Sequence, residues 1–246
     1  MRLEFPTDLG LAIPVLMAAL SLRLFRLAWR TRRLPELLVG IYFLLVPSAI
    51  SLLIRVSRFA PEDAIIVRAA ANALFDVGGI TMLLFAWSVF RPDAPWARVL
   101  AWGGSAALVA LWSAGFPLGA YEQPSFAPLV PSFATYVWVF VESFRYYQLL
   151  RRRERLGLAD PVLVNRFLLF AIWTGGVFAI TVLGTLGSVI QLVLGTFGDG
   201  GGLAHPAVLG TTRILAIAIG VALWLVFLPP ARYQAWLRAR AATATR

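Results

Sequence analysis

The sequence predicts an all-α polytopic membrane protein. We expect one domain over residues 1–246, a seven-transmembrane-helix bundle with its N-terminus outside and its C-terminus in the cytoplasm. Three observations predict this fold: the composition, seven apolar segments, and the arginines placed between them. Hydrophobic residues make up 60% of the 246 residues and charged residues 14%, and the mean hydropathy is +0.79. Because a soluble domain carries about a quarter charged residues, this composition indicates a lipid environment.

Seven apolar segments, each opening close to a proline, are the predicted helices. Proline is harmless in the first turn of a helix, because the N–H that it lacks would have no helical partner there. Segments of about 20 residues or more are long enough to cross ~30 Å of hydrocarbon at 1.5 Å per residue. The segments lie near residues 8–29, 35–57, 62–90, 95–115, 131–150, 162–195 and 206–230.

The arginines predict the orientation of these helices. The chain contains no lysine, so its net charge of +10 comes from arginine alone. Arginines follow the first, third, fifth and seventh segments, whereas the loops 116–130 and 196–205 contain no basic residue. Cytoplasmic loops of membrane proteins carry the excess of basic residues, which places the N-terminus outside. We therefore expect a multi-pass protein of a bacterial inner (cytoplasmic) membrane.

The third segment carries an unusual row of polar residues. Arg68, Asn72 and Asp76 are spaced at i, i+4 and i+8, so they share one face of a helix. Asp76 falls ~20 Å along the axis from Asp63, close to the middle of a bilayer. A polar face at that depth is costly unless it meets polar groups of neighbouring helices.

Glu142 lies midway through the fifth segment, and Arg213 lies inside the seventh. Arg68 and Arg213 each follow the opening proline of their segment by seven residues, so both are expected ~10–11 Å below the outer surface. Two guanidinium groups there would suit a carboxylate or a phosphate. Alternatively each arginine is already paired with an acid, Arg68 with Asp76 or Glu62 and Arg213 with Glu142. The candidate ligand-binding residues are Arg68, Asn72, Asp76, Glu142 and Arg213.

Enzymatic and nucleic-acid functions are not expected. The chain has no cysteine and one histidine, too few for a zinc centre, so we predict no metal and no cofactor. It contains no nucleophile elbow, no P-loop and no H-E-x-x-H motif. The arginines follow topology and do not form a folded basic surface for nucleic acid.

The tail Arg232–Arg246 carries Tyr233, Trp236 and Leu237 among arginines. This pattern predicts a short helix lying on anionic lipid or, equally, a frayed basic terminus.

Upstream, the segment Arg151–Phe170 resembles a stretch of uncharacterised bacterial seven-transmembrane-helix proteins. The resemblance is most specific at residues 157–161 (GLADP) and 165–167 (NRF). It implies a seven-helix fold and no particular activity. In layout the chain is also similar to microbial rhodopsins, but it lacks the lysine that their retinal requires.

These observations lead to a receptor-like membrane protein as the expected function. It would sense a small or anionic ligand and signal through a membrane or cytoplasmic partner, because the chain shows no output domain. One alternative is a small-solute transporter or ion pathway, favoured if the first three and last three helices are repeats. A second alternative is a non-catalytic structural subunit of a membrane complex.

Overall fold

The computed structural model describes residues 7–55, 60–122, 130–194 and 206–244, apart from the side chains of some helical residues within these ranges. Over these residues the chain forms eight helices and no strand. In chain order they are α1 (Thr7–Thr31), α2 (Leu34–Arg55), α3 (Pro61–Phe90), α4 (Pro95–Gly115), α5 (Val130–Arg155), α6 (Pro161–Leu194), α7 (Pro206–Phe227) and α8 (Ala231–Ala244). The predicted all-α class is confirmed.

Three helical stretches of the described chain are long and apolar enough to cross a membrane: Asp63–Phe90, Pro95–Gly115 and Pro161–Gly187. The pair Ile217–Phe227 and Ala231–Arg240 would add a fourth if both belong to one span, although they are bent by 86°. Leu34–Ile50 is a shorter apolar helix. Several helices therefore qualify as membrane spans, whereas the count of seven and the orientation remain predictions. The loop residues 123–129 and 195–205 lie outside the described chain.

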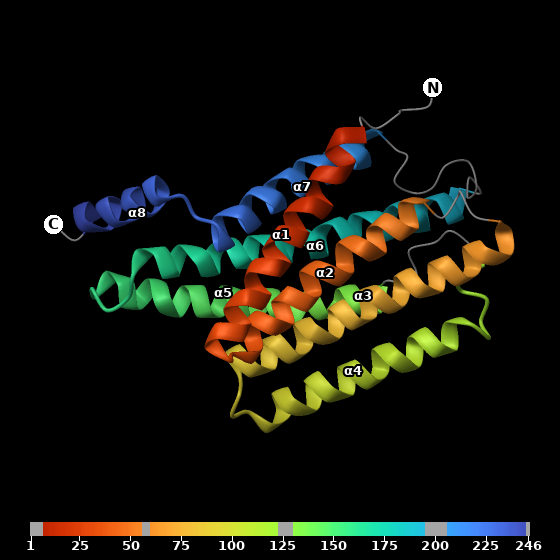
Figure 1. Cartoon of the computed structure of the whole chain (residues 1–246), viewed down its shortest axis with the longest axis horizontal. Coiled ribbons are helices and arrows are strands. Elements are labelled where there is room, and N and C mark those ends of the chain that lie inside the picture. The colour runs from red at the N-terminus through yellow and green to blue at the C-terminus, as the bar shows by residue number, and fades with distance from the viewer. Residues whose placement is uncertain (1–6, 56–59, 123–129, 195–205, 245–246) are drawn as a thin grey trace. The chain divides into compact units, whose positions relative to one another are not determined.

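The structure divides within α5 into two compact units, Met1–Thr135 and Tyr136–Arg246. In the first unit α1 packs against α2, α2 against α3, and α3 against α4 (Figure 1). Close approach of α2 and α3 depends on Gly78, where an added Cβ would lie 2.6 Å from a methyl group of Val46. In the second unit α6 packs against both α7 and α8, and Phe140 of α5 lies against Gly175 of α6.

A glycine, an aspartate and a proline shape the connection between α5 and α6. Gly157 adopts a φ of +71°, and the N–H of Leu158 reaches back to the carbonyl of Arg153, which closes the end of α5. Asp160 then caps α6, because its carboxylate accepts a hydrogen bond from the N–H of Val162 at 3.0 Å. Pro161 takes the first helical position, where its missing N–H costs nothing.

Candidate functional site

The polar row of α3 lies on the first unit and is largely shielded from the surface. Asn72 is 5% exposed and Asp76 is 7% exposed, while Arg68 is half-buried. The alanines between them on the helix, Ala69 and Ala71, are buried as well. Asn72 and Asp76 are thus shielded from the surface, as expected of a polar face that meets other parts of the protein. The groups that contact the polar row decide what it can do.

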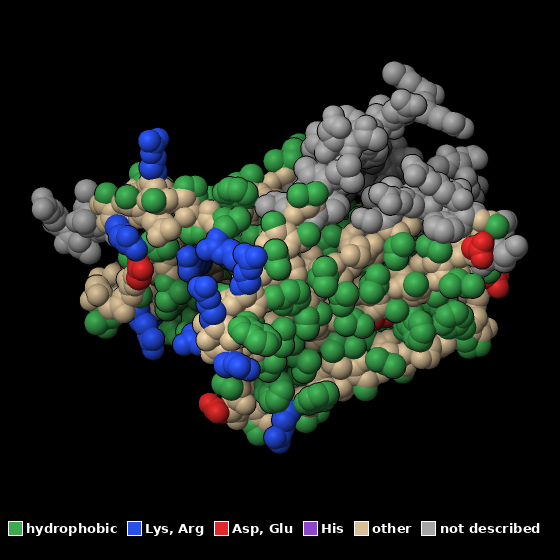
Figure 2. Space-filling model, in the orientation of Figure 1, with side chains coloured by type: hydrophobic (Ala, Val, Ile, Leu, Met, Phe, Trp, Pro, Cys, Tyr) green, Lys and Arg blue, Asp and Glu red, His purple; other side chains and the backbone are tan. Residues whose placement is uncertain are grey.

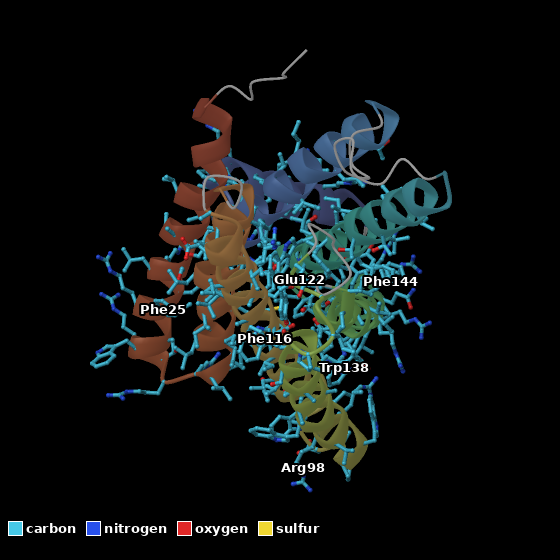
Figure 3. The ribbon with its side chains drawn as sticks, turned by 90° about the vertical axis from the view of Figure 1, so that its right-hand side faces the viewer. Phe25, Arg98, Phe116, Glu122, Trp138 and Phe144 are labelled. Atoms are coloured by element: carbon cyan, nitrogen blue, oxygen red, sulfur yellow. The ribbon has the colours of Figure 1, made fainter. Side chains whose placement is uncertain are left out.

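Arg68 donates to the backbone and not to Asp76, whereas the side chain of Glu62, the other acid considered for it, lies outside the described residues. Its Nε donates to the carbonyl oxygen of Tyr121 at 2.6 Å, and its Nη2 donates to that of Glu122 at 3.0 Å. Nε and Nη2 form the edge of the guanidinium that usually grips a carboxylate or phosphate. In this structure that edge holds the segment Phe116–Glu122, which follows α4 and whose two ends are labelled in Figure 3.

The segment Phe116–Glu122 is also fastened to α4. The Tyr121 hydroxyl donates to the carbonyl of Trp112 at 2.8 Å, and the ring of Phe116 contacts those of Trp112 and Tyr121 edge-on. Trp112 in turn donates from its indole nitrogen to the carbonyl of Ala69 on α3 at 2.9 Å. An added Cβ at Gly115 would lie 2.6 Å from the Tyr121 ring, so only glycine allows this ring to fold back. The segment is thereby bonded to both α3 and α4.

The charge of Asp76 in the polar row affects the pKa of Tyr121. Burial raises the pKa of its phenol above the ordinary value, and the negative charge of Asp76 raises that pKa further. The Tyr121 hydroxyl therefore stays protonated at neutral pH and continues to donate its hydrogen bond to the carbonyl of Trp112.

Asp76 receives its hydrogen bond from the beginning of α5. The hydroxyl of Ser132 donates to Asp76 Oδ1, and Ser132 is 2% exposed. Thr135, one turn later, donates to the carbonyl of Ser132 at 2.6 Å. An added Cβ at Gly79 would lie 3.6 Å from the Ser132 Cα, so α3 offers little bulk where α5 approaches. Ser132 is the one hydrogen-bond partner of Asp76 among the described residues.

Asn72 is incompletely satisfied. Its Nδ2 donates to the carbonyl of Arg68 on its own helix at 2.8 Å. Its Oδ1 is buried and has no hydrogen-bond partner within the described part of the chain. A buried acceptor without a partner costs about 1–3 kcal/mol, so such atoms are expected where a ligand or water binds.

The structure does not place the other two predicted site residues relative to this row. Glu142 is 5% exposed on the part of α5 that belongs to the second unit, and it has a partner there or elsewhere in the chain. Arg213 lies on α7, and its side chain is outside the described residues. Pairing of either residue with Arg68 or Asp76 therefore stays a prediction.

Sequence reasoning missed Ser132 as a partner of Asp76. One hydroxyl row lies on α6, where Thr174 and Thr181 bond to carbonyls of their own helix, as Ser and Thr in membrane helices commonly do. A second hydroxyl row on α5, Ser132, Thr135 and Ser143 at spacings of three and eight, is fully buried. This spacing, which puts the three hydroxyls on one face of α5, was the sequence signal that could have identified Ser132 as a partner of a buried acid.

No group of three or more His, Cys, Asp or Glu side chains that could hold a metal ion occurs among the described residues. Comparison of the chain with protein-family models, curated proteins and solved structures finds no match. The site must therefore be interpreted from its own chemistry. Asp76 with one hydroxyl donor retains lone pairs for further donors, a proton or a cation, and Asn72 offers a second acceptor.

Proposed function

We propose that the chain is an integral membrane receptor-like protein that senses a small ligand at the polar row of α3. The observation that carries the proposal is that Arg68 bonds the segment Phe116–Glu122 to the same helix that bears Asn72 and Asp76. One rigid helix thus joins a buried polar group to a segment outside the apolar spans. We propose further that a membrane or cytoplasmic partner receives the signal.

The ligand is bound by hydrogen bonds to Asp76 and to Oδ1 of Asn72. Both atoms are acceptors, which favours a ligand that donates hydrogen bonds or carries positive charge. An anionic ligand would have to displace the carbonyls of Tyr121 and Glu122 from Arg68, or use the remaining Nη1 edge. The contacts of Arg68 therefore support a donor ligand more strongly than the anion first expected between Arg68 and Arg213.

Binding moves α3 relative to the beginning of α5. A ligand that donates to Asp76 Oδ1 competes with the Ser132 hydroxyl, whose hydrogen bond to that oxygen joins α3 to α5. A ligand can shift a conformational equilibrium only through such differential contacts. The movement reaches the segment Phe116–Glu122 because Arg68 lies two helical turns from Asp76 on the same rigid helix.

The experiment is a screen of small polar solutes for thermal stabilisation of the purified protein, repeated with Asp76→Asn. We expect a solute that stabilises the wild type, loses its effect in Asp76→Asn, and does not cross proteoliposomes that contain the protein. Stabilisation that persists in Asp76→Asn would contradict the proposed site. A folded protein that no solute stabilises, and that purifies with another membrane protein, would favour the structural-subunit alternative.

A pathway for a cation or small solute is the second candidate, and one observation favours it. Within the described chain Asp76 is buried with one hydroxyl partner, one helical turn from the unsatisfied amide oxygen of Asn72, and buried carboxylates inside membrane proteins mark proton and ion pathways. Flux of protons, sodium or the identified solute into proteoliposomes, abolished by Asp76→Asn, would establish this candidate in place of the receptor.

A further inference from the structure

The second half of α1 carries a stripe of arginines. Arg23, Arg26 and Arg30 are spaced by three and four residues, and Arg33 continues the same spacing just after the helix ends. At 100° per residue the three helical positions fall within about 60° of arc, and all four side chains are exposed. Figure 2 shows basic side chains gathered around this half of α1. We call Arg23, Arg26, Arg30 and Arg33 the arginine stripe.

An aromatic edge runs beside the arginine stripe. Phe25 and Trp29 form one i, i+4 pair, and Arg26 and Arg30 form the neighbouring one. These four side chains line a shallow, open surface hollow of about 420 Å³. One side of the hollow is therefore cationic and the other is aromatic.

The Phe25 side of the hollow is held in place by contacts with α2. Phe25, labelled in Figure 3, packs on Gly40 of α2 so closely that an added Cβ there would lie 2.8 Å from the Phe25 ring. The hydroxyl of Ser21 donates to the carbonyl of Gly40 at 2.9 Å, which fixes α1 against α2 at the same point. Trp29 remains 76% exposed, with the guanidinium of Arg32 stacked 5.4 Å from its ring centre.

The surroundings of the hollow are apolar and exposed. Leu22 on the aromatic side is 54% exposed, and Leu27 on the other side of the stripe is 42% exposed. Two arginines one turn apart suit the phosphate of a headgroup, because each offers paired donors in a plane. Exposed leucines and an exposed tryptophan beside them suit acyl chains and the membrane interface. A free phosphate would use the arginines and leave the aromatic half of the hollow without a function.

We propose that this hollow is a binding site for an anionic phospholipid, with the phosphate between Arg26 and Arg30. The headgroup lies against the arginine stripe, and Trp29 and Leu22 contact the beginning of the acyl chains. Charge complementarity selects phosphatidylglycerol or a similar anionic lipid over a zwitterionic one. The site is separate from the polar row of α3, so it does not rest on the proposed function.

The test measures phospholipid binding to the purified full-length protein by native mass spectrometry. It compares phosphatidylglycerol with phosphatidylcholine for the wild type and for Arg26→Gln/Arg30→Gln. The matched control is Arg151→Gln/Arg152→Gln, which removes two exposed arginines from the end of α5. We expect the double change on α1 to weaken phosphatidylglycerol binding roughly 30-fold and the control to change it by less than about threefold. An equal loss in both variants would mean general charge attraction and would overturn the site.

A second measurement separates lipid from free anion and does not require the double variant to fold. Phosphatidylglycerol brominated near the headgroup should quench tryptophan fluorescence in the wild type, and Trp29→Phe should remove a distinct part of that quenching. The single change Arg30→Gln should weaken binding roughly fivefold. Unchanged quenching in Trp29→Phe would overturn the proposal, as would inorganic phosphate competing with the lipid at equal concentration.

Discussion

At the scale of single residues, Arg68 decides how the polar row is interpreted. The sequence predicts that Arg68, Asn72 and Asp76 share a face of α3, and they do. It cannot predict that Arg68 donates to the carbonyls of Tyr121 and Glu122, because every residue has a carbonyl and none is marked by its side chain. The sequence drew attention to Asp76 as a partner of Arg68, but in the described structure Arg68 donates to backbone carbonyls of a short segment.

Replacing Arg68 should destabilise the protein through this segment. Arg68→Gln removes two charge-assisted hydrogen bonds from a half-buried site, which we expect to cost about 1.5–3 kcal/mol. Arg98→Gln, an exposed change on α4, is the control and should cost less than about 0.5 kcal/mol. Thermal unfolding in the same detergent measures both. Equal losses would show that the contacts of Arg68 are not stabilising.

Tyr121 predicts a pH dependence of stability at alkaline pH. Its pKa in the folded protein is raised, by burial and then by the charge of Asp76, above the unfolded value of about 10. The unfolded chain therefore loses this proton first, so stability is complete below about pH 10 and declines as the pH rises beyond it. Tyr121→Phe should lose the hydrogen bond to Trp112 but show a shallower alkaline decline. Parallel profiles from pH 8 to 11 would contradict the raised pKa.

At the scale of helices, the sequence was most informative about helix ends that are marked by proline or glycine. Prolines at the first position predict the starts of α3, α4 and α6, and the cap at Asp160 follows from the same reasoning. The end of the seventh segment was placed at residue 230, whereas α7 ends at Phe227. Pro229 and Pro230 explain the difference, because proline lacks the N–H for a helical bond and disfavours helical geometry before it. The fifth segment was placed to residue 150, but its helix continues to Arg155 because arginines extend it into water until Gly157.

Two glycines with different backbone geometry should respond oppositely to alanine. Gly157→Ala places a Cβ at a φ of +71°, which should cost roughly 1–2 kcal/mol although there is space around it. Gly103→Ala also meets nothing within 4 Å but lies inside α4, where alanine should stabilise by up to about 1 kcal/mol. Unfolding midpoints of the two variants test this. A loss at Gly103 as large as at Gly157 would contradict the explanation.

At the scale of the whole molecule, composition was sufficient for a helical membrane protein and insufficient for its function. The described chain contains three apolar spans, or four if the bent pair counts as one. The prediction of seven spans rests on the seven apolar segments, and the predicted orientation rests on the arginine pattern. Both concern insertion into a membrane, which packing within the described chain does not reveal. The relation of Asp76 to Glu142 could not be predicted either, because it depends on how the parts of the bundle assemble.

Reporter fusions test the predicted orientation. Fusions after residues 33, 93 and 155 should report the cytoplasm, and fusions after residues 60, 122 and 200 should report the outer side. The expected result follows from the arginines after the first, third and fifth segments. Two neighbouring fusions that report the same side would refute the seven-helix topology.

The central claim is that Arg68 couples the polar row of α3 to the segment Phe116–Glu122. The chain has no cysteine, so Leu118→Cys, at a position that is 79% exposed, gives a single thiol on this segment. The most direct measurement is the rate at which a maleimide labels that thiol in nanodiscs, with Leu156→Cys in the second unit as the control. We predict that Asp76→Asn raises the rate at Leu118→Cys roughly threefold or more, and that it has no such effect once Arg68→Gln is present. An equal effect of Asp76→Asn with and without Arg68, or no effect at all, would contradict the account.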